Sequence, residues 1–307
     1  MLNFLFAFDE NYHIQGCVSI FSLLENVDTQ IDVYVIKNQT NATFSFPTKI
    51  VNHKNLNNLV IKNIQLEKEF YNVRMSHVSE ATFYRLYLSN LFTEEDFNII
   101  YLDADIICVN NPINEIISTF DDMDSDSKFL GFADELKKND YSEPFHRLEM
   151  KNDKYFNAGV MLLNLRKWKE NNYTQKSLDL VERLKNKAKF WDQDILNSLI
   201  DGNYFTISNN LNFRTSGVST DRRLNQVKFV HYSGKSKPWA VGGIVEEHGM
   251  IYHKYYQDLF GKEFHLVVNN RKNSILKILK HLKYLKKLPI NRLFKYLLLS
   301  LLAIIKK

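Results

Sequence analysis

Glycine, proline and cysteine are all scarce in this sequence of 307 residues. It has 10 Gly and 5 Pro against 22 Phe and 16 Tyr, a composition that speaks against disorder and favours packed regular elements. The two cysteines, Cys17 and Cys108, lie in apolar segments without metal-ligand spacing. We therefore expect reduced, buried thiols in a reducing compartment and no disulfide framework.

Long hydrophobic runs are also missing. The apolar start, residues 2–8, has no basic region before it and is followed by Asp9 and Glu10 where a cleavage site would belong, so we interpret it as a buried strand. The last apolar run, residues 296–305, reaches about half of the roughly 20 residues that a membrane-spanning helix needs. The sequence therefore predicts no transmembrane helix.

Acidic residues are absent from residues 271–307, which carry eleven Lys or Arg. The whole chain has 40 basic and 35 acidic residues, a net charge of +5, so without those eleven the first 270 residues carry 29 against 35, or −6. Because the lysines alternate with Ile, Leu, Phe and Tyr, we expect basic amphipathic helices on an anionic membrane surface. A soluble helix with a solvated lysine face, or a partner-binding helix, is the alternative. We accordingly predict a domain over residues 1–265 and a tail over 266–307.

The first two thirds of the chain alternate short apolar runs with helical patterns. This alternation predicts an α/β fold with a mostly parallel central sheet. Strands are expected at residues 2–8, 31–36, 61–66, 97–102, 129–133, 158–165 and 227–230. Helices, marked by apolar spacings of three and four, are expected at residues 14–24, 79–91, 113–120, 175–185 and 192–200. Polar segments at residues 135–154 and 209–226 are expected to be loops over a site.

The most informative segment, residues 98–109, is an apolar run interrupted by Asp103 and Asp105. Burying an unpaired carboxylate costs several kcal/mol, so a cation is expected beside them. Separation by Ala104 puts both carboxylates on one side of an extended strand, or at the mouth of a turn where the strand ends. Hard carboxylate oxygens suit Mg²⁺ or Mn²⁺ bridging to phosphate. A lone Asp-x-Asp is common and otherwise indicates a solvated turn.

Three later segments add polar groups at strand and helix ends. Asn157 and Gly159 open an apolar strand, where glycine lets backbone approach a ligand and an amide can bond sugar hydroxyls; a simple turn is the alternative. Asp192, Gln193 and Asp194 begin a helix, where capping is the alternative. A strand then leads into a loop with a histidine, a glycine and two lysines, which suit a metal and a diphosphate. The residues singled out in this loop are His231, Gly234 and Lys237.

These four segments, in this order, resemble glycosyltransferase family 8 over roughly residues 1–250. Among its members, the lipooligosaccharide α-1,4-galactosyltransferases share the patterns Tyr-Leu-Asp-x-Asp, Tyr-Phe-Asn-Ala-Gly-Val, Asp-Gln-Asp-Ile-Leu-Asn and His-Tyr-x-Gly-x-x-Lys-Pro-Trp. The resemblance implies a GT-A fold, a UDP-hexose donor, Mn²⁺ or Mg²⁺, and transfer with retention of anomeric configuration. Galactose is favoured over glucose as the hexose, and a glycan or glycolipid such as lipopolysaccharide core or lipooligosaccharide as the acceptor.

The resemblance also assigns roles to residues by motif. The metal ligands match Asp103, Asp105 and His231, with Ala104 between the carboxylates, and the diphosphate loop matches Gly234 and Lys237. Uridine contacts match Ala7, Asp9 and Asn11, and the helix before the metal strand matches His77, Thr82 and Arg85. Contacts to the donor sugar match Asp134, Asn157, Ala158, Asp192 and Gln193. Asp192 and Gln193 are the candidate catalytic residues, and both double displacement and front-face attack stay open.

Two other functions fit the same scaffold. A nucleotidyltransferase would make a nucleotide sugar, but it usually brings a glycine-rich loop after the first strand, and residues 8–12 contain no glycine. A non-catalytic carbohydrate-binding protein is the other alternative. Nucleic-acid binding is not indicated, because the basic tail has an apolar face. We expect a cytoplasmic enzyme, peripheral on the inner face of the cytoplasmic membrane.

Overall fold

A computed structural model describes residues 1–38, 45–65, 80–137, 141–184, 187–215, 224–234, 237–240 and 247–267, with Phe294, Leu297, Leu298 and Leu301. His77 and nearly all of the basic segment lie outside these described residues. The chain divides into two compact units. The first is Met1–Phe213 with Gln226–Phe229, and the second is Arg214–Asn225 with Val230–Lys307.

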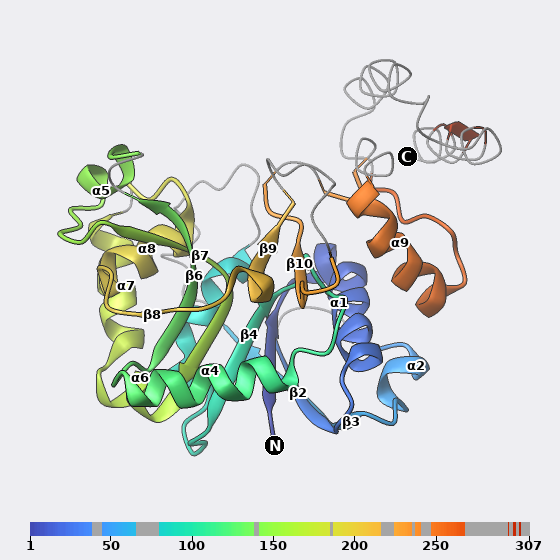
Figure 1. Cartoon of the computed structure of the whole chain (residues 1–307), viewed down its shortest axis with the longest axis horizontal. Helices are drawn as coiled ribbons and strands as arrows, with labels where there is room; N and C mark the ends of the chain where they lie inside the picture. Colours follow the sequence, from blue (N-terminus) through green and yellow to red (C-terminus); the bar gives the residue numbers. More distant parts are fainter. Residues whose placement is uncertain are drawn as a thin grey trace. The chain divides into compact units, whose positions relative to one another are not determined.

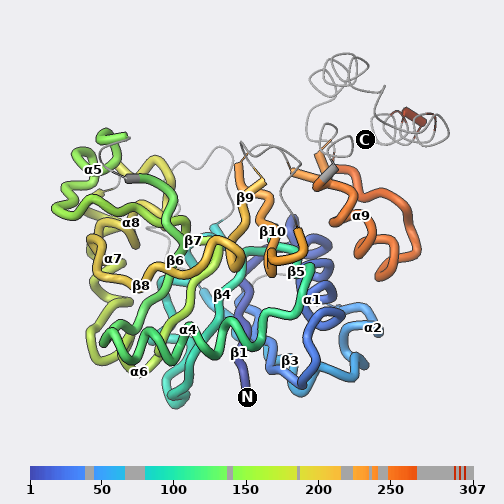
Figure 2. Tube along the Cα trace, in the orientation of Figure 1, coloured from blue at the N-terminus to red at the C-terminus, as the bar shows by residue number. Residues whose placement is uncertain are grey.

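The first unit is built on a seven-stranded sheet with the order β3-β2-β1-β4-β7-β6-β8 (Figures 1 and 2). The strands are β1 (Asn3–Ala7), β2 (Ile31–Asn38), β3 (Leu56–Ile64), β4 (Asn98–Asp103), β6 (Leu130–Lys137), β7 (Lys154–Asn164) and β8 (Phe205–Thr206). All neighbouring pairs are parallel except those of β7, which runs antiparallel to both β4 and β6. The predicted α/β fold with a mostly parallel sheet is confirmed.

The central strands are buried along their length. Every residue of β1 is buried, as are the nine residues between the ends of β7. A strand covered on both faces needs a continuous apolar run, which is what residues 2–8 and 158–165 supply. These two apolar runs therefore form the buried strands β1 and β7 in the middle of the sheet.

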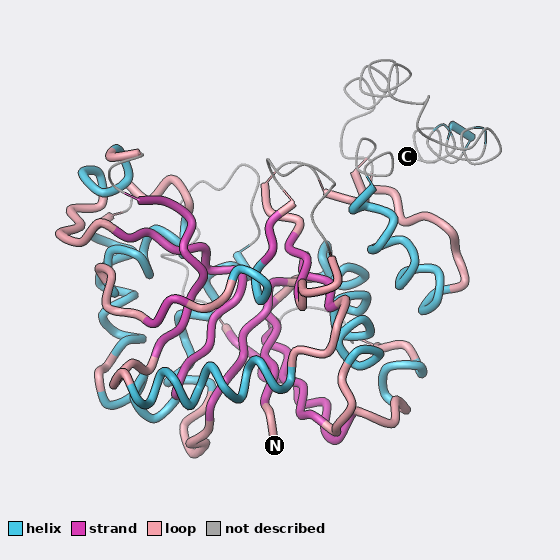
Figure 3. The backbone as a smooth tube through the Cα atoms, viewed as in Figure 1, coloured by secondary structure: helices cyan, strands magenta, loops and turns pink. Residues whose placement is uncertain are grey.

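Helices flank this sheet, as the cyan segments of Figure 3 show. They are α1 (His13–Asn26), α2 (Thr48–Val51), α3 (Leu88–Leu91), α4 (Ile113–Ser125), α5 (Glu143–Arg147), α6 (Leu165–Glu170), α7 (Tyr173–Arg183) and α8 (Trp191–Ile200), with the 3-10 turns η1 (Glu10–Tyr12), η3 (Glu80–Tyr87) and η4 (Asn209–Asn212). The aromatic side chains of Trp168 and Tyr84 are fully buried in the main core cluster. The helices predicted at residues 14–24, 113–120 and 192–200 are confirmed.

Three predicted elements differ in detail. Residues 79–91 were expected to form one α-helix, but η3 and the short α3 occupy this stretch, because apolar residues three apart fit a 3-10 turn as well. The strand expected at 61–66 begins earlier, at Leu56, in an exposed stretch of β3 where the amides of Asn57 and Asn58 bond Asp32. The expected loop 135–154 starts inside β6 and contains α5.

The short strands β5 (Ile106–Cys108), β9 (Phe213–Arg214) and β10 (Phe229–His231) lie outside the seven-stranded sheet. Within the second unit, α9 (Glu247–Phe260) packs its Tyr252 ring against Trp239 and His265. Among the described residues, no helix combines the length and the apolar character that crossing a membrane requires. Cys17 and Cys108 are buried free thiols, as predicted.

Candidate functional site

The two carboxylates of the apolar segment lie at the end of a strand. Asp103 is the last residue of β4, Ala104 and Asp105 form a turn, and β5 resumes at Ile106. Of the two placements that the sequence left open, the turn is therefore the one observed. The side chain of Asp103 is 27% exposed, and Asp105 is 9% exposed.

The end of β1 lies beside this turn. Ala7 is paired with Asp103 across the parallel β1–β4 ladder. The chain then turns through η1, where Asp9 Oδ1 accepts from the Tyr12 N–H at 3.1 Å and Asp9 Oδ2 accepts from the Asn11 amide at 3.2 Å. Because parallel strands end at the same sheet edge, the residues matched to uridine contacts, Ala7 at the end of β1 and Asp9 and Asn11 just after it, lie at the edge where Asp103 ends β4.

Arg85 of η3 joins Asp103 to the start of α8. Its Nη2 lies 2.6 Å from Asp103 Oδ1, its Nε lies 3.0 Å from Asp192 Oδ2, and its Nη1 donates to the carbonyl of Ala158. The contact with Asp192 is an ion pair without hydrogen-bond alignment. The guanidinium also lies 4.1 Å from the ring centroid of Tyr101, whose hydroxyl donates to Asp103 Oδ1 at 2.8 Å.

This cluster has unusual ionisation. Burial raises the pKa of Asp192 to about 7, and the nearby Arg85 only partly opposes it. Burial alone would lower the pKa of Arg85, but attraction to Asp103 and Asp192 outweighs it and raises that pKa. The result is a guanidinium fixed between two carboxylates at the sheet edge.

The donor set at the turn fits a divalent metal ion. Strand β10 ends with His231, which is 3% exposed. Two carboxylates with one imidazole suit Mn²⁺ or Mg²⁺. Arg85 and Tyr101 both bind Oδ1 of Asp103, so among the described residues Oδ2 remains available to a cation.

The antiparallel direction of β7 brings a third motif to the same edge. Leu102 of β4 pairs with Val160, so the first half of β7 extends beyond the end of β4, where Asp103 lies. That half contains Asn157, Ala158 and Gly159, and the Asn157 Oδ1 atom accepts from the Gly159 N–H at 3.1 Å. The Asn157–Gly159 motif at the start of β7 therefore lies close to Asp103 at the end of β4.

The amide of Gln193, on α8, is engaged on both sides. Its Oε1 accepts from Asn157 Nδ2 and from the Ala158 N–H, each at 3.1 Å. Its Nε2 donates to Glu135 Oε2 at 2.9 Å and to the Tyr155 hydroxyl oxygen at 3.1 Å. Neither Glu135 nor Tyr155 was predicted as a site residue, because nothing local in the sequence ties either one to Gln193.

Asp194 is fully buried and has three partners. Its Oδ1 accepts from the Tyr155 hydroxyl at 2.7 Å, and its Oδ2 accepts from Arg147 Nη1 at 2.7 Å and from the Phe190 N–H at 2.9 Å. Phe190 is the N-cap of α8, so the capping interpretation is correct for this residue but incomplete. Trp191, between the cap and Asp192, has a left-handed backbone with φ of 46°.

Asp134 has different neighbours from the adjacent Glu135. Its Oδ1 accepts from the Tyr204 hydroxyl at 2.5 Å and from Thr206 Oγ1 at 3.3 Å. The pairing of β6 with β7 is irregular between Asp134 and Leu136. Such an irregularity re-aims side chains, and here it accompanies two consecutive carboxylates with separate sets of partners.

In the second unit, the described residues after β10 have hydrogen-bond partners within that unit. Gly234 has φ of 76°, a conformation that favours glycine, and a Cβ there would meet nothing within 4 Å. Lys237 Nζ donates to the Tyr232 carbonyl at 2.7 Å, and His253 Nε2 lies 2.9 Å from the Pro238 carbonyl oxygen. Val267 N–H donates to the Trp239 carbonyl at 2.8 Å.

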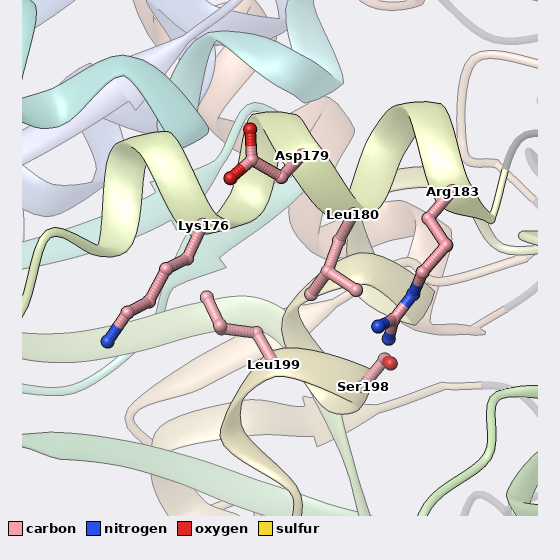
Figure 4. A pocket seen from close by; sticks show the side chains of 6 residues that line it. All are labelled: Lys176, Asp179, Leu180, Arg183, Ser198 and Leu199. Carbon is pink, nitrogen blue, oxygen red and sulfur yellow. The ribbon is translucent and has the colours of Figure 1, made fainter.

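A pocket lies between α7 and α8, and none of its lining residues belongs to the sets above (Figure 4). Leu180 and Leu199 face each other across it, Arg183 reaches toward Ser198, and Asp179 points away from α8.

Thr82, another residue matched from the sequence, accepts a hydrogen bond through its backbone carbonyl from Arg85 Nε at 3.3 Å.

Comparison with known proteins identifies the family of the chain. A lipopolysaccharide 1,2-glucosyltransferase of Escherichia coli is 30% identical over 264 residues, covering 77% of this chain and 73% of that protein. A lipopolysaccharide 1,3-galactosyltransferase of Salmonella typhimurium is 24% identical over 254 residues, covering 78% of this chain and 74% of that protein.

Solved structures show the same fold. The galactosyltransferase LgtC, crystallised with donor and acceptor sugar analogues, has a TM-score of 0.67 at 23% identity, covering 89% of this chain and 99% of that one. Its GT-A fold is therefore the fold of this chain. The model of glycosyl transferase family 8 matches residues 3–241. The chain belongs to glycosyltransferase family 8.

Proposed function

We propose that this glycosyltransferase moves a hexose from a UDP-sugar to a glycan acceptor with retention of anomeric configuration, using Mn²⁺ or Mg²⁺. The observation that carries the proposal is the turn that presents Asp103 and Asp105 at the end of β4, beside the Arg85–Asp192 pair. A cation site next to amide and carboxylate side chains suits a donor that joins a diphosphate to a sugar.

The chemistry of the metal site concerns the leaving group. A divalent ion held by Asp103, Asp105 and His231 would neutralise charge on the diphosphate of the departing UDP. Tyr101 and Arg85 fix the orientation of the Asp103 carboxylate, because both bind its Oδ1. We assign Gly234 and Lys237 to the diphosphate, since a glycine in a left-handed turn followed by a lysine suits an anion.

The donor sugar is assigned to the edge formed by β6, β7 and α8. Asn157 and Gln193 are hydrogen-bonded to each other there, and Ala158 contacts both Gln193 and Arg85. Asp192 and Gln193 are proposed to orient the donor and to shield the oxocarbenium-like transition state, and Asp134 to contact the sugar. Ala7, Asp9, Asn11 and Ala104 are assigned to the nucleotide, because they surround the end of β1 and the metal turn.

The acceptor is proposed to be lipopolysaccharide or lipooligosaccharide core, and the donor UDP-galactose before UDP-glucose. The relatives in Escherichia coli and Salmonella typhimurium carry lipopolysaccharide in their names, one as a glucosyltransferase and one as a galactosyltransferase. LgtC supports galactose. A glycolipid acceptor is held in a membrane. It therefore agrees with the proposed division into a catalytic domain over residues 1–265 and a membrane-associating tail over 266–307.

That tail is proposed to hold the enzyme on the inner face of the cytoplasmic membrane through residues 271–307, with their eleven basic and no acidic residues. Deleting residues 271–307 should then shift the protein from the membrane fraction to the soluble fraction. Unchanged partition would remove this part of the proposal.

The proposed activity is tested by UDP release. Purified enzyme with Mn²⁺ is incubated with UDP-Gal, UDP-Glc or UDP-GlcNAc and with lactose or lipooligosaccharide core as acceptor, and the product linkage is determined by NMR. We expect acceptor-dependent UDP release with one hexose and an α-linked product. Pyrophosphate formed from UTP and a sugar 1-phosphate, without UDP release, would identify a nucleotidyltransferase instead. Sugar binding without either reaction would identify a non-catalytic protein.

A further inference from the structure

A chain of hydrogen bonds runs from α5 to the amide of Gln193. Arg147, on α5, binds Asp194 Oδ2 at 2.7 Å, Asp194 Oδ1 accepts from the Tyr155 hydroxyl at 2.7 Å, and the Tyr155 oxygen accepts from Gln193 Nε2 at 3.1 Å. These residues come from α5, β7 and α8. The whole chain of contacts lies in the first unit.

The direction of each bond is determined by chemistry. A carboxylate paired with Arg147 only accepts hydrogen bonds, so the single hydrogen of the Tyr155 hydroxyl must point to Asp194. Burial raises the pKa of Tyr155, and the charge of Asp194 adds to the shift, so the hydroxyl keeps that hydrogen. Only lone pairs of the Tyr155 oxygen then face Gln193, and only an N–H of Gln193 can meet them.

The opposite side of the amide agrees with this direction. Gln193 Oε1 meets two donors, the Ala158 N–H and Asn157 Nδ2, while Nε2 also meets the acceptor Glu135. A flipped amide would place N–H against N–H at Ala158 and oxygen against carboxylate at Glu135. Both amide hydrogens and the amide oxygen therefore have partners in a single orientation.

We propose that Tyr155 and Asp194 are positioning residues that fix the amide orientation of Gln193, with Arg147 holding Asp194 in place. The inference rests on the proposed function for its kinetic consequence, because Gln193 is the residue assigned to the donor sugar. With its oxygen bound to two donors, Gln193 presents a fixed dipole to the sugar. Tyr155 and Asp194 act only through it.

A double-mutant cycle tests this role. Tyr155→Phe removes one oxygen and keeps the ring, so we expect kcat to fall about fivefold, the effect of one hydrogen bond, while KM for the UDP-sugar stays within about twofold. Gln193→Ala should lower kcat by about tenfold or more. In the double variant, kcat should equal that of Gln193→Ala alone, because Tyr155 then has no amide to position. A product of the two single effects would overturn the proposal.

Tyr173→Phe is the matched control, because it removes the hydroxyl of another largely buried tyrosine, on α7. Its kcat should equal that of the wild type. A second experiment compares two variants of Arg147. Arg147→Lys keeps a positive charge near Asp194 and should retain a higher kcat than Arg147→Met. Equal loss in both variants would contradict the part assigned to Arg147.

A measurement without turnover separates this proposal from the proposed function. The side-chain ¹⁵N–¹H signals of Gln193, assigned by their loss in Gln193→Ala, should exchange with water faster in Tyr155→Phe than in wild type or Tyr173→Phe. Unchanged exchange would overturn the positioning role. If wild-type enzyme released UDP from no UDP-sugar, the proposed function would fail, while the exchange measurement would still decide whether Tyr155 fixes the amide.

Discussion

Arg85 Nη2 lies 2.6 Å from Asp103 Oδ1, and the same guanidinium pairs with Asp192 across its Nε edge. The arginine is 3% exposed, so a buried cation links a proposed metal ligand to the residue before Gln193. The family resemblance matched Arg85 to the helix before the metal strand. Its contacts indicate an additional role, which is to set the distance between the carboxylates of Asp103 and Asp192.

Arg85→Met should lower the free energy of unfolding by about 3 kcal/mol, because it leaves buried Asp192 without its cation. Urea denaturation at pH 7 measures this change. Arg166→Met is the control, since the ion pair of Arg166 with Asp96 joins two side chains that are each more than half exposed, and it should change stability by under about 0.5 kcal/mol. Equal losses in the two variants would show that the Arg85 cluster contributes no special stability.

Asp105→Asn should weaken Mn²⁺-dependent UDP binding by about tenfold or more, because an amide oxygen lacks the charge that a divalent ion requires. Isothermal titration with UDP, with and without Mn²⁺, is the measurement. Asp179→Asn, on the face of α7 directed away from α8 in Figure 4, should bind UDP as wild type does. Wild-type affinity in Asp105→Asn would remove Asp105 from the metal site.

Gly16→Ala should destabilise the fold by about 1–3 kcal/mol, because its Cβ would lie 2.4 Å from Cε1 of the Phe8 ring, which is 1% exposed. Phe8 lies between Ala7 and Asp9, so UDP binding should weaken as well. Chemical denaturation and UDP titration measure the two effects. Gly16→Ala combined with Phe8→Leu should recover part of both, and failure to recover would show that the ring is not the obstacle.

The second unit should lose stability in mild acid. Burial lowers the pKa values of His253 and His265 to about 4, from an ordinary value of 6.5. Between these values the unfolded chain binds more protons, so stability is complete above pH 6.5 and falls as pH drops toward 4. The slope should approach about 1.4 kcal/mol per pH unit for each histidine.

Urea denaturation at a series of pH values from 7 to about 4.5 checks this dependence. His265→Gln should reduce the slope, whereas the exposed His146→Gln should leave it unchanged. An identical slope in His265→Gln and wild type would contradict the assignment.

The sequence predicted those parts of the site that depend on short segments. The apolar run around Asp103 and Asp105 required a cation, and the structure places Arg85 beside Asp103. The reversal of β7 was not predictable, since a buried apolar run does not reveal its direction. Without that direction, the meeting of Asn157 with the end of β4 could not be derived from the residues alone.

The partners of Gln193 were missed for a related reason. Glu135, Tyr155 and Arg147 lie 58, 38 and 46 positions from it in the sequence, and they meet it, or Asp194 beside it, only through folding. A helix start rich in acidic residues indicates capping from the local pattern. Asp194 does more than cap α8 because its side chain is fully buried, and burial depends on tertiary packing, which the local sequence pattern does not show.

The three tryptophans of the chain lie in three different surroundings. Trp168 is fully buried and donates its indole N–H to Thr174, Trp239 packs against Tyr252 in the second unit, and Trp191 stands directly before Asp192 with its left-handed backbone. Intrinsic fluorescence is therefore a composite of core, loop and site. A variant that keeps Trp191 as the sole tryptophan would provide an optical reporter of events at the start of α8, with no label attached.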